Sequence, residues 1–371
     1  MAATSAAVVI ERIFNFSAGP AVLPESVIEQ AQKDLWNIFD SGIGIMEHSH
    51  RGKVFDRVIE EAEADCRKIA NISDDYAVLF LQGGATTQFG QIPMNFLGPD
   101  KIADYPNTGE WTTKAIKDAK LFGKVNVPFD GAAENFVRVP TDADMAGKLS
   151  PNAAYMHYCS NNTIFGTRYL TPPKTKAPLI CDASSEMFSR PIDINKHALI
   201  YAGAQKNLGP SGVTLVIIRK DFAATANKNL MAMMSYTNHI ENGSRLNTPP
   251  TFGIYFMGLV FKWILEQGGL SVIEKRNAAK AKFIYDAIDE SGGFYIGHSH
   301  PECRSHMNVT FRTRTPELDA LFLKETAKNR MDGLKGHRST GGIRASIYNA
   351  FPAAGCEALA QLMQDFAARN G

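Results

Sequence analysis

The sequence has little that would point to an exported, membrane-bound or nucleic-acid-binding protein. It has five cysteines among 371 residues, an odd number with no CxxC pair, which is typical of reduced thiols rather than of a disulfide framework. Lys and Arg (39) nearly balance Asp and Glu (38), so no charge of one sign favours nucleic acid or a membrane surface. The longest apolar runs have the length of buried strands, far short of the roughly 20 residues of a membrane-spanning helix.

The N-terminal segment also lacks the pattern of a signal peptide. Residues 1–10 are mostly small and apolar, but they have neither the basic start nor the long apolar stretch of a signal peptide. Together these absences predict a cytoplasmic protein without nucleic-acid or membrane partners. The sequence does contain an ordinary globular mixture, 44% apolar and 21% charged, and it is long enough for two domains.

The first two thirds of the chain alternate between helical and strand patterns. Apolar residues recur at helical spacing over 27–38 and 54–69. Short, densely apolar runs follow, and each is predicted to be a buried strand: 76–81, 101–105, 154–159, 178–181, 198–202 and 213–218. Runs that are apolar on both faces and separated by helices are typical of a mostly parallel sheet covered by helices.

The pattern changes after about residue 255. Helices are predicted at 252–267, 270–290, 316–329 and 356–369, and strands at 307–312 and 343–347. We therefore expect an α/β fold with a large domain at 16–260 and a smaller α+β C-terminal domain at 261–371. Residues 1–15 are expected to pack near the small domain.

Lys206 lies in a Gly-rich connection between two predicted buried strands, Tyr201-Ala-Gly-Ala-Gln-Lys-Asn-Leu-Gly-Pro-Ser-Gly-Val213. On composition alone, a lysine that extends from a turn into solvent is the commoner outcome. The alternative is a lysine desolvated enough to lose its proton and condense with an aldehyde.

Asp182 favours the second interpretation. It follows the apolar strand 178–181, and the ends of neighbouring parallel strands face one crevice. An aspartate at a strand end is by itself more often a cap or a turn residue. A pyridoxal cofactor, however, needs a carboxylate that keeps its ring nitrogen protonated. The pair therefore predicts pyridoxal 5'-phosphate held by Lys206 as a Schiff base.

Three further positions fit such a cofactor, although each has a simpler explanation. Gln82-Gly-Gly-Ala-Thr-Thr87 lies between a strand and a helix, where free N–H groups would bind the cofactor phosphate; the alternative is a helix N-cap made by Thr86. Trp111 would stack on the ring, or it is a partly buried tryptophan like any other. Thr163 would hydrogen-bond near the ring, or it is a turn residue.

Two Gly-rich basic segments, 48–53 and 336–344, each precede a predicted element. Arginine binds a carboxylate or a phosphate through two parallel hydrogen bonds, which lysine cannot form. The arginines and flanking histidines of these segments suit a substrate with two or three negative groups. Solvated basic loops are the alternative, and they fit less well because both segments join apolar elements.

The residues His298, His300, Cys303 and His306 are of metal-ligand types at workable spacing. Carboxylate ligands and supporting partners are not evident nearby. A His-rich surface turn is therefore favoured over a zinc site, and no metal is expected.

Taken together, these strings resemble the phosphoserine aminotransferases, a family of fold-type I pyridoxal-phosphate enzymes, nearly from end to end. The resemblance begins at Phe14-Asn-Phe-Ser-Ala-Gly-Pro-Ala21. Besides Trp111, its further strings are 48–51, 157–163, 189–193, 200–210, 247–252 and 336–350. A departure lies at 84–87, where many members have an arginine and this chain has Gly-Ala-Thr-Thr, so the contacts to the cofactor phosphate are open.

The resemblance implies the roles of the cofactor residues. Lys206 would form the Schiff base and Asp182 would pair with the ring nitrogen. The other cofactor contacts would come from Ala85, Thr86, Trp111, Thr163, Gln205, Asn247 and Thr248. Asn247 and Thr248 would belong to the second subunit of a homodimer with shared active sites.

The resemblance also implies the reaction. In two ping-pong halves, the amino group of L-glutamate would pass to 3-phosphohydroxypyruvate, giving 2-oxoglutarate and O-phospho-L-serine in L-serine biosynthesis. Arg344 would bind the substrate α-carboxylate. The distal phosphate or the glutamate side chain would bind His50 and Arg51 of the second subunit together with His337 and Arg338. The sequence leaves open whether 4-phosphohydroxythreonine is also a substrate.

Three alternatives remain. Another small-molecule aminotransferase, acting on serine, alanine or glyoxylate, would need one carboxylate grip and no phosphate pocket. A cysteine desulfurase would need a nucleophilic cysteine, for which Cys303 is the candidate. A non-catalytic cofactor-binding regulator would bring a DNA-binding domain or a basic face, and the sequence has neither.

Overall fold

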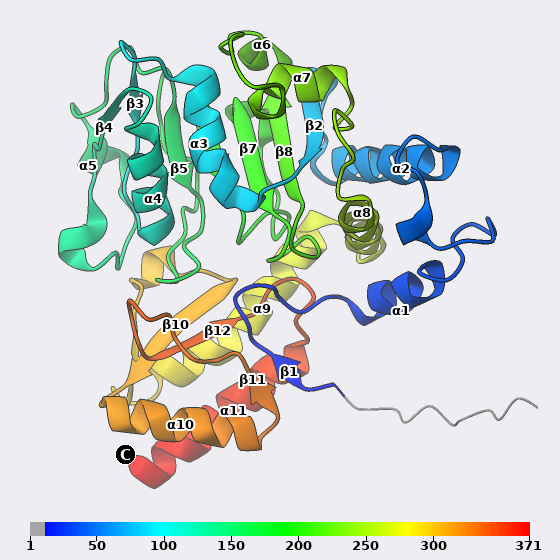
Figure 1. Cartoon of the computed structure of the whole chain (residues 1–371). Helices are drawn as coiled ribbons and strands as arrows, with labels where there is room; N and C mark the ends of the chain where they lie inside the picture. The colour runs from blue at the N-terminus through cyan, green and yellow to red at the C-terminus, as the bar shows by residue number, and fades with distance from the viewer. Residues whose placement is uncertain (1–11) are drawn as a thin grey trace, which may run out of the picture.

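The computed structural model describes residues 12–371; the expectations for residues 1–11 lie outside this range. The chain forms a larger and a smaller part, each built around its own sheet (Figure 1). The large sheet has seven strands and the small sheet has three. The predicted α/β class, with a mostly parallel sheet covered by helices, is confirmed.

The large sheet consists, in spatial order, of β2 (Tyr76–Leu81), β8 (Thr214–Arg219), β7 (Leu199–Gly203), β6 (Leu179–Asp182), β5 (Met156–Cys159), β3 (Ile102–Asp104) and β4 (Lys124–Asn126). All neighbouring pairs are parallel except the two that involve β8. The six strands predicted from apolar runs are observed: β2 has the predicted ends, and the other five have ends shifted by one or two residues. The seventh, β4, is a short edge strand without an apolar run, so its sequence gave no signal.

Helices cover both faces of this sheet because alternate strand residues point to opposite sides. Val78 and Phe80 of β2 pack in one core cluster with α2 (Lys53–Ala70) and α8 (Thr251–Glu266). Leu79 and Leu81 pack in a second cluster with α3 (Gly84–Phe96) and α4 (Glu110–Ala119). The sheet is therefore a buried middle layer, and its strand ends are where side chains can gather around a ligand.

The small part contains the antiparallel sheet β12 (Ile343–Ser346), β10 (Asn308–Thr313) and β9 (Tyr295–Gly297). Its apolar face packs with α9 (Leu270–Asp289), α10 (Pro316–Lys328) and α11 (Ala353–Asn370) in a separate core cluster. Strand β1 (Phe14–Asn15) pairs in parallel with β11 (Met331–Asp332). The first described residues therefore lie beside the last third of the chain (Figure 1).

The remaining elements are short. They are α1 (Glu25–Asp34), η1 (Ile45–Glu47), η2 (Gly131–Glu134), α5 (Asp142–Met145), η3 (Ile194–Lys196), α6 (Lys220–Ala223), η4 (Ala232–Met234), α7 (Tyr236–Glu241) and η5 (Pro301–Cys303). Helix α1 ends four residues before the apolar spacing predicted, because Ile38 is buried from a turn rather than from the helix. In residues 12–371 no single helix is long and apolar enough to span a membrane; α8 and α9 meet that test only together, across an 87° bend.

Candidate active site

Lys206 lies in the connection between β7 and β8, at the carboxyl end of β7. Its Nζ donates a hydrogen bond to Thr163 Oγ1 at 2.7 Å and lies 5.3 Å from the centre of the Trp111 ring. Burial lowers the pKa of Lys206, and nearby Arg344 lowers it further, while the Asp182 carboxylate opposes the shift. The site therefore favours the neutral, nucleophilic amine more than water does.

Asp182 ends the neighbouring strand β6 and pairs in register with Tyr201 of β7. Its side chain is buried, and Ser184 donates to Oδ1 twice, from its N–H at 2.9 Å and from its hydroxyl at 2.6 Å. Both bonds use Oδ1, so Ser184 fixes the carboxylate through one of its two oxygens. The predicted neighbourhood of Asp182 and Lys206 at one sheet edge is present. Sequence reasoning missed Ser184, although an Asp-x-Ser turn is a recognisable signal.

The turn between β2 and α3 lies at the same edge. Leu81, the last residue of β2, and Gly203, the last residue of β7, both pair with Thr214 of β8. The two strands therefore end at the same height of the sheet, and the connections that follow them start at the same edge. Gly83 has φ +93°, and a Cβ there would meet Thr87 Oγ1 at 2.1 Å. Only glycine fits this position. Thr87 Oγ1 donates to the Gly83 carbonyl at 2.8 Å, which closes the turn.

Helix α3 starts directly after this turn. Its N-cap is Gly83, which makes no side-chain cap, so the alternative interpretation of Thr86 as the N-cap is wrong. Ala85 is half-buried and Thr86 exposed in the first turn. Together with half-buried Gln205, beside Lys206 on the neighbouring connection, they can offer main-chain N–H, hydroxyl and amide donors to an anion.

Trp111 is held in place by the segment that carries Thr163. Asn162 Nδ2 donates to the Thr108 carbonyl at 2.7 Å, and a Cβ on Gly109 would meet Asn162 Nδ2 at 1.9 Å. This close approach brings the start of α4, and with it Trp111, next to Thr163 and Lys206. The Trp111 Nε1 is buried and has no hydrogen-bond partner among the described residues, as expected for a donor that faces a bound group.

The small part contributes Arg344 from β12. Its Nη1 donates to the Thr163 carbonyl at 3.4 Å, and burial lowers its pKa. Its Nε is buried without a partner in residues 12–371. His337 and exposed Arg338 precede it on the loop 336–342. Burial lowers the pKa of His337, as do Arg344 and Arg338. The Arg344 N–H donates to the Leu334 carbonyl at 2.8 Å, and Lys335 forms a bridge with Ile343, so the loop returns to β12 beside Arg344.

Of the four residues expected from a second subunit, two lie beside the turn that precedes α3 in their own chain, and two lie elsewhere. Asn247 and Thr248 lie beside Gln82, whose Nε2 donates to Asn247 Oδ1 at 3.1 Å and to the Thr248 carbonyl at 3.2 Å. His50 and Arg51 lie between η1 and α2. Among the described residues, no hydrogen bond or ion pair connects His50 or Arg51 with Lys206 or Arg344.

The His298–His306 stretch has separate partners for each side chain. His298 Nε2 lies 2.9 Å from the Asn135 carbonyl, and His306 Nε2 accepts from Arg168 Nη2 at 3.1 Å. His300 lies 3.4 Å from Glu302, and Cys303 is buried against main-chain carbonyls. Burial also raises the pKa of the Cys303 thiol, which does not favour a nucleophilic thiolate. Within the described range, no group of three His, Cys, Asp or Glu side chains could hold a metal.

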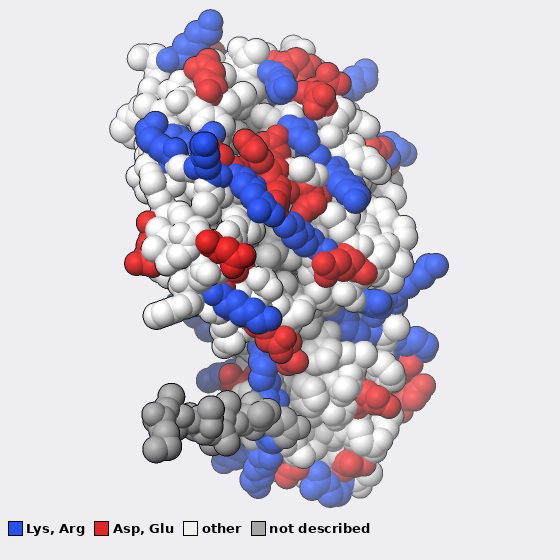
Figure 2. Space-filling model, turned by 90° about the vertical axis from the view of Figure 1, so that its right-hand side faces the viewer, with Lys and Arg blue, Asp and Glu red and all other residues white. Residues whose placement is uncertain are grey.

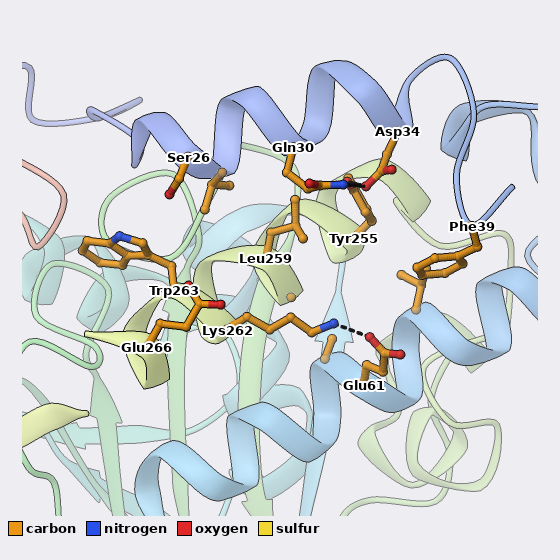
Figure 3. Close-up of a pocket in the computed structure, with 14 residues that line it drawn as sticks. Ser26, Gln30, Asp34, Phe39, Glu61, Tyr255, Leu259, Lys262, Trp263 and Glu266 are labelled. Carbon is orange, nitrogen blue, oxygen red and sulfur yellow. Dashed lines mark hydrogen bonds and ion pairs between the residues drawn. The ribbon is translucent and has the colours of Figure 1, made fainter. Parts of the chain in front are cut away.

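A cavity of about 380 Å³ lies between α1, α2 and α8 (Figure 3). None of the predicted site residues lines it. Three of its charged groups have partners: Lys262 pairs with Glu61, and Asp34 accepts from Gln30 and Tyr255. This cavity is separate from the Lys206 cluster and has no group set for the same chemistry.

Comparison with known proteins agrees with this geometry. The family model described as Aminotransferase class-V matches residues 13–359. The phosphoserine aminotransferase of Herpetosiphon aurantiacus is 51% identical over 360 residues, covering 97% of this chain and 99% of that protein. The solved phosphoserine aminotransferase from Bacillus circulans subsp. alkalophilus is 48% identical with a TM-score of 0.95, covering 98% of this chain and 100% of that chain.

A solved PLP-bound phosphoserine aminotransferase from Trichomonas vaginalis is 40% identical with a TM-score of 0.90, covering 95% of this chain and 100% of that chain. These likenesses run over nearly the whole length of both partners, so they concern the complete fold and not one shared part. The chain belongs to the class-V aminotransferases and, within them, to the phosphoserine aminotransferase family.

Proposed function

We propose that this chain is a pyridoxal-phosphate-dependent aminotransferase that transfers the amino group of L-glutamate to 3-phosphohydroxypyruvate, giving O-phospho-L-serine for L-serine biosynthesis. The observation that carries the proposal is that Lys206 and Arg344 both donate hydrogen bonds to Thr163. It puts a nucleophilic amine next to a guanidinium that can bind a carboxylate. The full-length likeness to phosphoserine aminotransferases supports the choice of substrates.

The residues at the site fit pyridoxal phosphate. Lys206 supplies the amine and buried Asp182 a carboxylate for the ring nitrogen, while the ring of Trp111 lies 5.3 Å from Lys206 Nζ. The glycine turn before α3 and the donors of Ala85, Thr86 and Gln205 suit a phosphate group. When bound, the cofactor supplies an electron sink that stabilises negative charge at the substrate Cα.

The protein side chains would then orient the substrate and move the proton. Lys206, with its pKa lowered by burial, would take the proton from the substrate Cα as general base and would then deliver it, as general acid, to the cofactor carbon that receives the amino group. The Thr163 hydroxyl holds the amine in position. Asp182, fixed by Ser184, keeps the ring nitrogen protonated.

Substrate recognition would use the basic groups around Arg344. The guanidinium of Arg344 binds the α-carboxylate at two points. His337 and Arg338, on the adjoining loop, bind the distal phosphate or the side-chain carboxylate of glutamate. His50 and Arg51 complete this pocket from the second subunit of a homodimer, and Asn247 and Thr248 reach the cofactor phosphate in the same way.

An exposed apolar surface supports the homodimer. Five large apolar side chains lie at or near the surface just before His50, and Trp36 among them is 85% exposed: Leu35, Trp36, Phe39, Ile43 and Met46. Such a concentration of exposed apolar groups marks an interaction surface. The face that carries α1 and α2 otherwise shows Lys, Arg, Asp and Glu interspersed (Figure 2).

We also propose that the chain has a large domain at 16–260 and a small domain at 261–371, which the separate cores support. A cytoplasmic location is proposed as well.

Absorbance spectroscopy tests the reaction. The protein is loaded with pyridoxal phosphate, and its visible spectrum is recorded before and after addition of O-phosphoserine, with serine as the control. We expect O-phosphoserine to change the spectrum at concentrations where serine does nothing. An equal response to serine would favour another aminotransferase, and a protein that never gains visible absorbance with the cofactor would reject the proposal.

Mixing two inactive variants tests the shared site. Lys206→Ala and Arg51→Ala are unfolded and refolded together. If Arg51 acts across the interface, mixed dimers hold one intact site, and about a quarter of the parental activity returns. If Arg51 acts within its own chain, neither site of the mixed dimer is complete and no activity returns.

A further inference from the structure

Lys280 is a buried lysine outside the groups discussed so far. It lies on α9 and is 4% exposed. Its Nζ donates to four main-chain carbonyls: Tyr348 at 2.7 Å, Ile347 at 3.1 Å, Phe351 at 3.2 Å and Asn349 at 3.4 Å. No ion pair of the described residues includes it. Its charge is therefore balanced by carbonyl dipoles alone, as a bound monovalent cation would be.

The four carbonyls belong to the segment 347–351, which connects β12 with α11. This segment reaches the Lys206 connection directly, because the Asn349 N–H donates to Asn207 Oδ1 at 2.9 Å. Asn207 in turn donates to the Met187 carbonyl at 2.7 Å. The residue next to Lys206 is thus held by the segment that Lys280 holds.

A second residue of α9 supports the same segment. Asn277, one turn before Lys280, donates to Asn349 Oδ1 at 2.8 Å and to the Ser189 carbonyl at 3.0 Å. Asn349 Nδ2 donates to the Phe188 carbonyl at 2.8 Å. The segment 347–351 is therefore fixed between α9 and the loops of the large sheet, immediately after the strand that carries Arg344.

We infer that Lys280 is a positioning residue for the Lys206 reaction: its ammonium holds the segment 347–351 against Asn207 and so sets Lys206 relative to Arg344. This inference rests on the proposed function. A residue needed only to fill the space would be apolar, because burying an amine costs free energy that an alkyl chain avoids. Four carbonyls converging on one point need a donor, and only a lysine ammonium delivers three protons there.

The variant Lys280→Met tests the inference, with Lys282→Met as the matched control. Lys282 lies on the same helix, but its side chain is 72% exposed and pairs with Asp286. We expect Lys280→Met to lower the single-turnover rates of both half-reactions by about tenfold to a hundredfold, as misplacement of a reacting group does. Lys282→Met should match the parent.

Two further measurements separate positioning from plain stability. The pH dependence of the visible absorbance of the pyridoxal-phosphate-loaded protein reports on Lys206 without any substrate, and we expect it to shift by about one pH unit in Lys280→Met. In Lys280→Ala, where space is left for a small cation, methylammonium should restore part of the parental titration. An unshifted titration together with a lower Tm would overturn the inference.

The variant Asn207→Ala keeps the test decisive if the Lys280 variants do not fold. It removes the acceptor of the Asn349 N–H. The pH dependence of the absorbance should therefore shift in the same direction as in Lys280→Met, and amide hydrogen exchange at 347–351 should become faster. An unchanged titration in this variant would overturn the inference while leaving the proposed function intact. A parent protein that does not bind the cofactor would reject both.

Discussion

The amine of Lys206 lies 2.7 Å from the hydroxyl of Thr163, across two connections that are 43 residues apart in the sequence. The main-chain carbonyl of Thr163 also accepts a hydrogen bond from Arg344 of the small sheet. Thr163 therefore contacts both the proposed catalytic amine and the proposed carboxylate-binding residue. Small changes at Thr163 should affect the chemistry more than the fold.

Replacing Thr163 by Val should lower kcat about tenfold, which corresponds to about 1.4 kcal/mol for one lost orienting hydrogen bond. The shape is conserved, so KM for glutamate should change little. Steady-state kinetics in the forward direction measure both values. The control is Thr167→Val: Thr167 is also buried near this loop, but its hydroxyl has no partner among the described residues. Equal losses in the two variants would contradict a specific role for the Thr163 hydroxyl.

Replacing Lys206 by Ala should abolish turnover, because both the nucleophilic amine and the proton-transferring group are lost. Cofactor binding should persist through the ring and phosphate contacts. Activity assays and retention of cofactor on gel filtration test the two expectations. Lys220→Ala, an exposed lysine at the far end of β8, is the control. Full activity of Lys206→Ala would remove the central assignment.

Replacing Asp182 by Asn should reduce kcat by about a hundredfold to a thousandfold. The amide can still accept from Ser184, so the loop geometry is retained while the negative charge is lost. Single-turnover absorbance changes with O-phosphoserine measure the step directly. A rate within a few-fold of the parent would mean that another group holds the ring nitrogen.

Replacing Arg338 by Ala should lower kcat/KM for phosphorylated substrates more than for glutamate, because a phosphate carries more charge than a carboxylate. Replacing Arg344 by Ala should lower kcat/KM for both kinds of substrate, because every substrate has an α-carboxylate. The comparison uses kcat/KM for O-phosphoserine and for glutamate in each variant. If Arg338→Ala affects the two substrates equally, the phosphate pocket has been misplaced.

Stability should fall in mild acid because of buried histidines. His197 lies at 0% exposure. Its Nδ1 donates to the Asp193 carbonyl at 3.0 Å, so Nε2 of the neutral ring accepts from the Tyr158 hydroxyl at 2.9 Å. Burial lowers the pKa of His197 to about 4 from its ordinary value of 6.5. The unfolded chain takes up the proton near pH 6.5 but the folded chain only near pH 4. The contribution of His197 to the free energy of unfolding is therefore fully present above pH 6.5. It falls by on the order of 3 kcal/mol as the pH falls toward 4.

Urea unfolding between pH 4 and pH 7 measures this loss. His197→Gln removes the titrating group and should make the free energy of unfolding less dependent on pH in that range. His157, whose pKa burial also lowers to about 4, stays in this variant and accounts for part of the remaining slope. The same slope in variant and parent would show that His197 does not couple to folding.

The sequence determined the alternating α/β order and the identity of the reactive groups. The central strands of the large sheet, such as β2 and β8, are densely apolar because they are buried on both faces, and periodicity detects such runs well. Lys206 stands out as a charged residue in a Gly-rich connection between apolar strands, Asp182 as a carboxylate at the end of an apolar strand, and Arg344 as an arginine that follows a Gly-rich basic loop. The edge strand β4 and the carboxylate-fixing Ser184 gave weaker local signals and were missed.

Only the tertiary structure decided which of these groups meet. The contact of Thr163 with Lys206 and Arg344, the close approach of Asn162 to Gly109, and the four carbonyls around Lys280 each join segments far apart in the chain. Sequence periodicity reports how each segment faces its own core, and it contains no information about the distance between two loops. That distance follows from strand order, register and helix packing, which are properties of the whole fold.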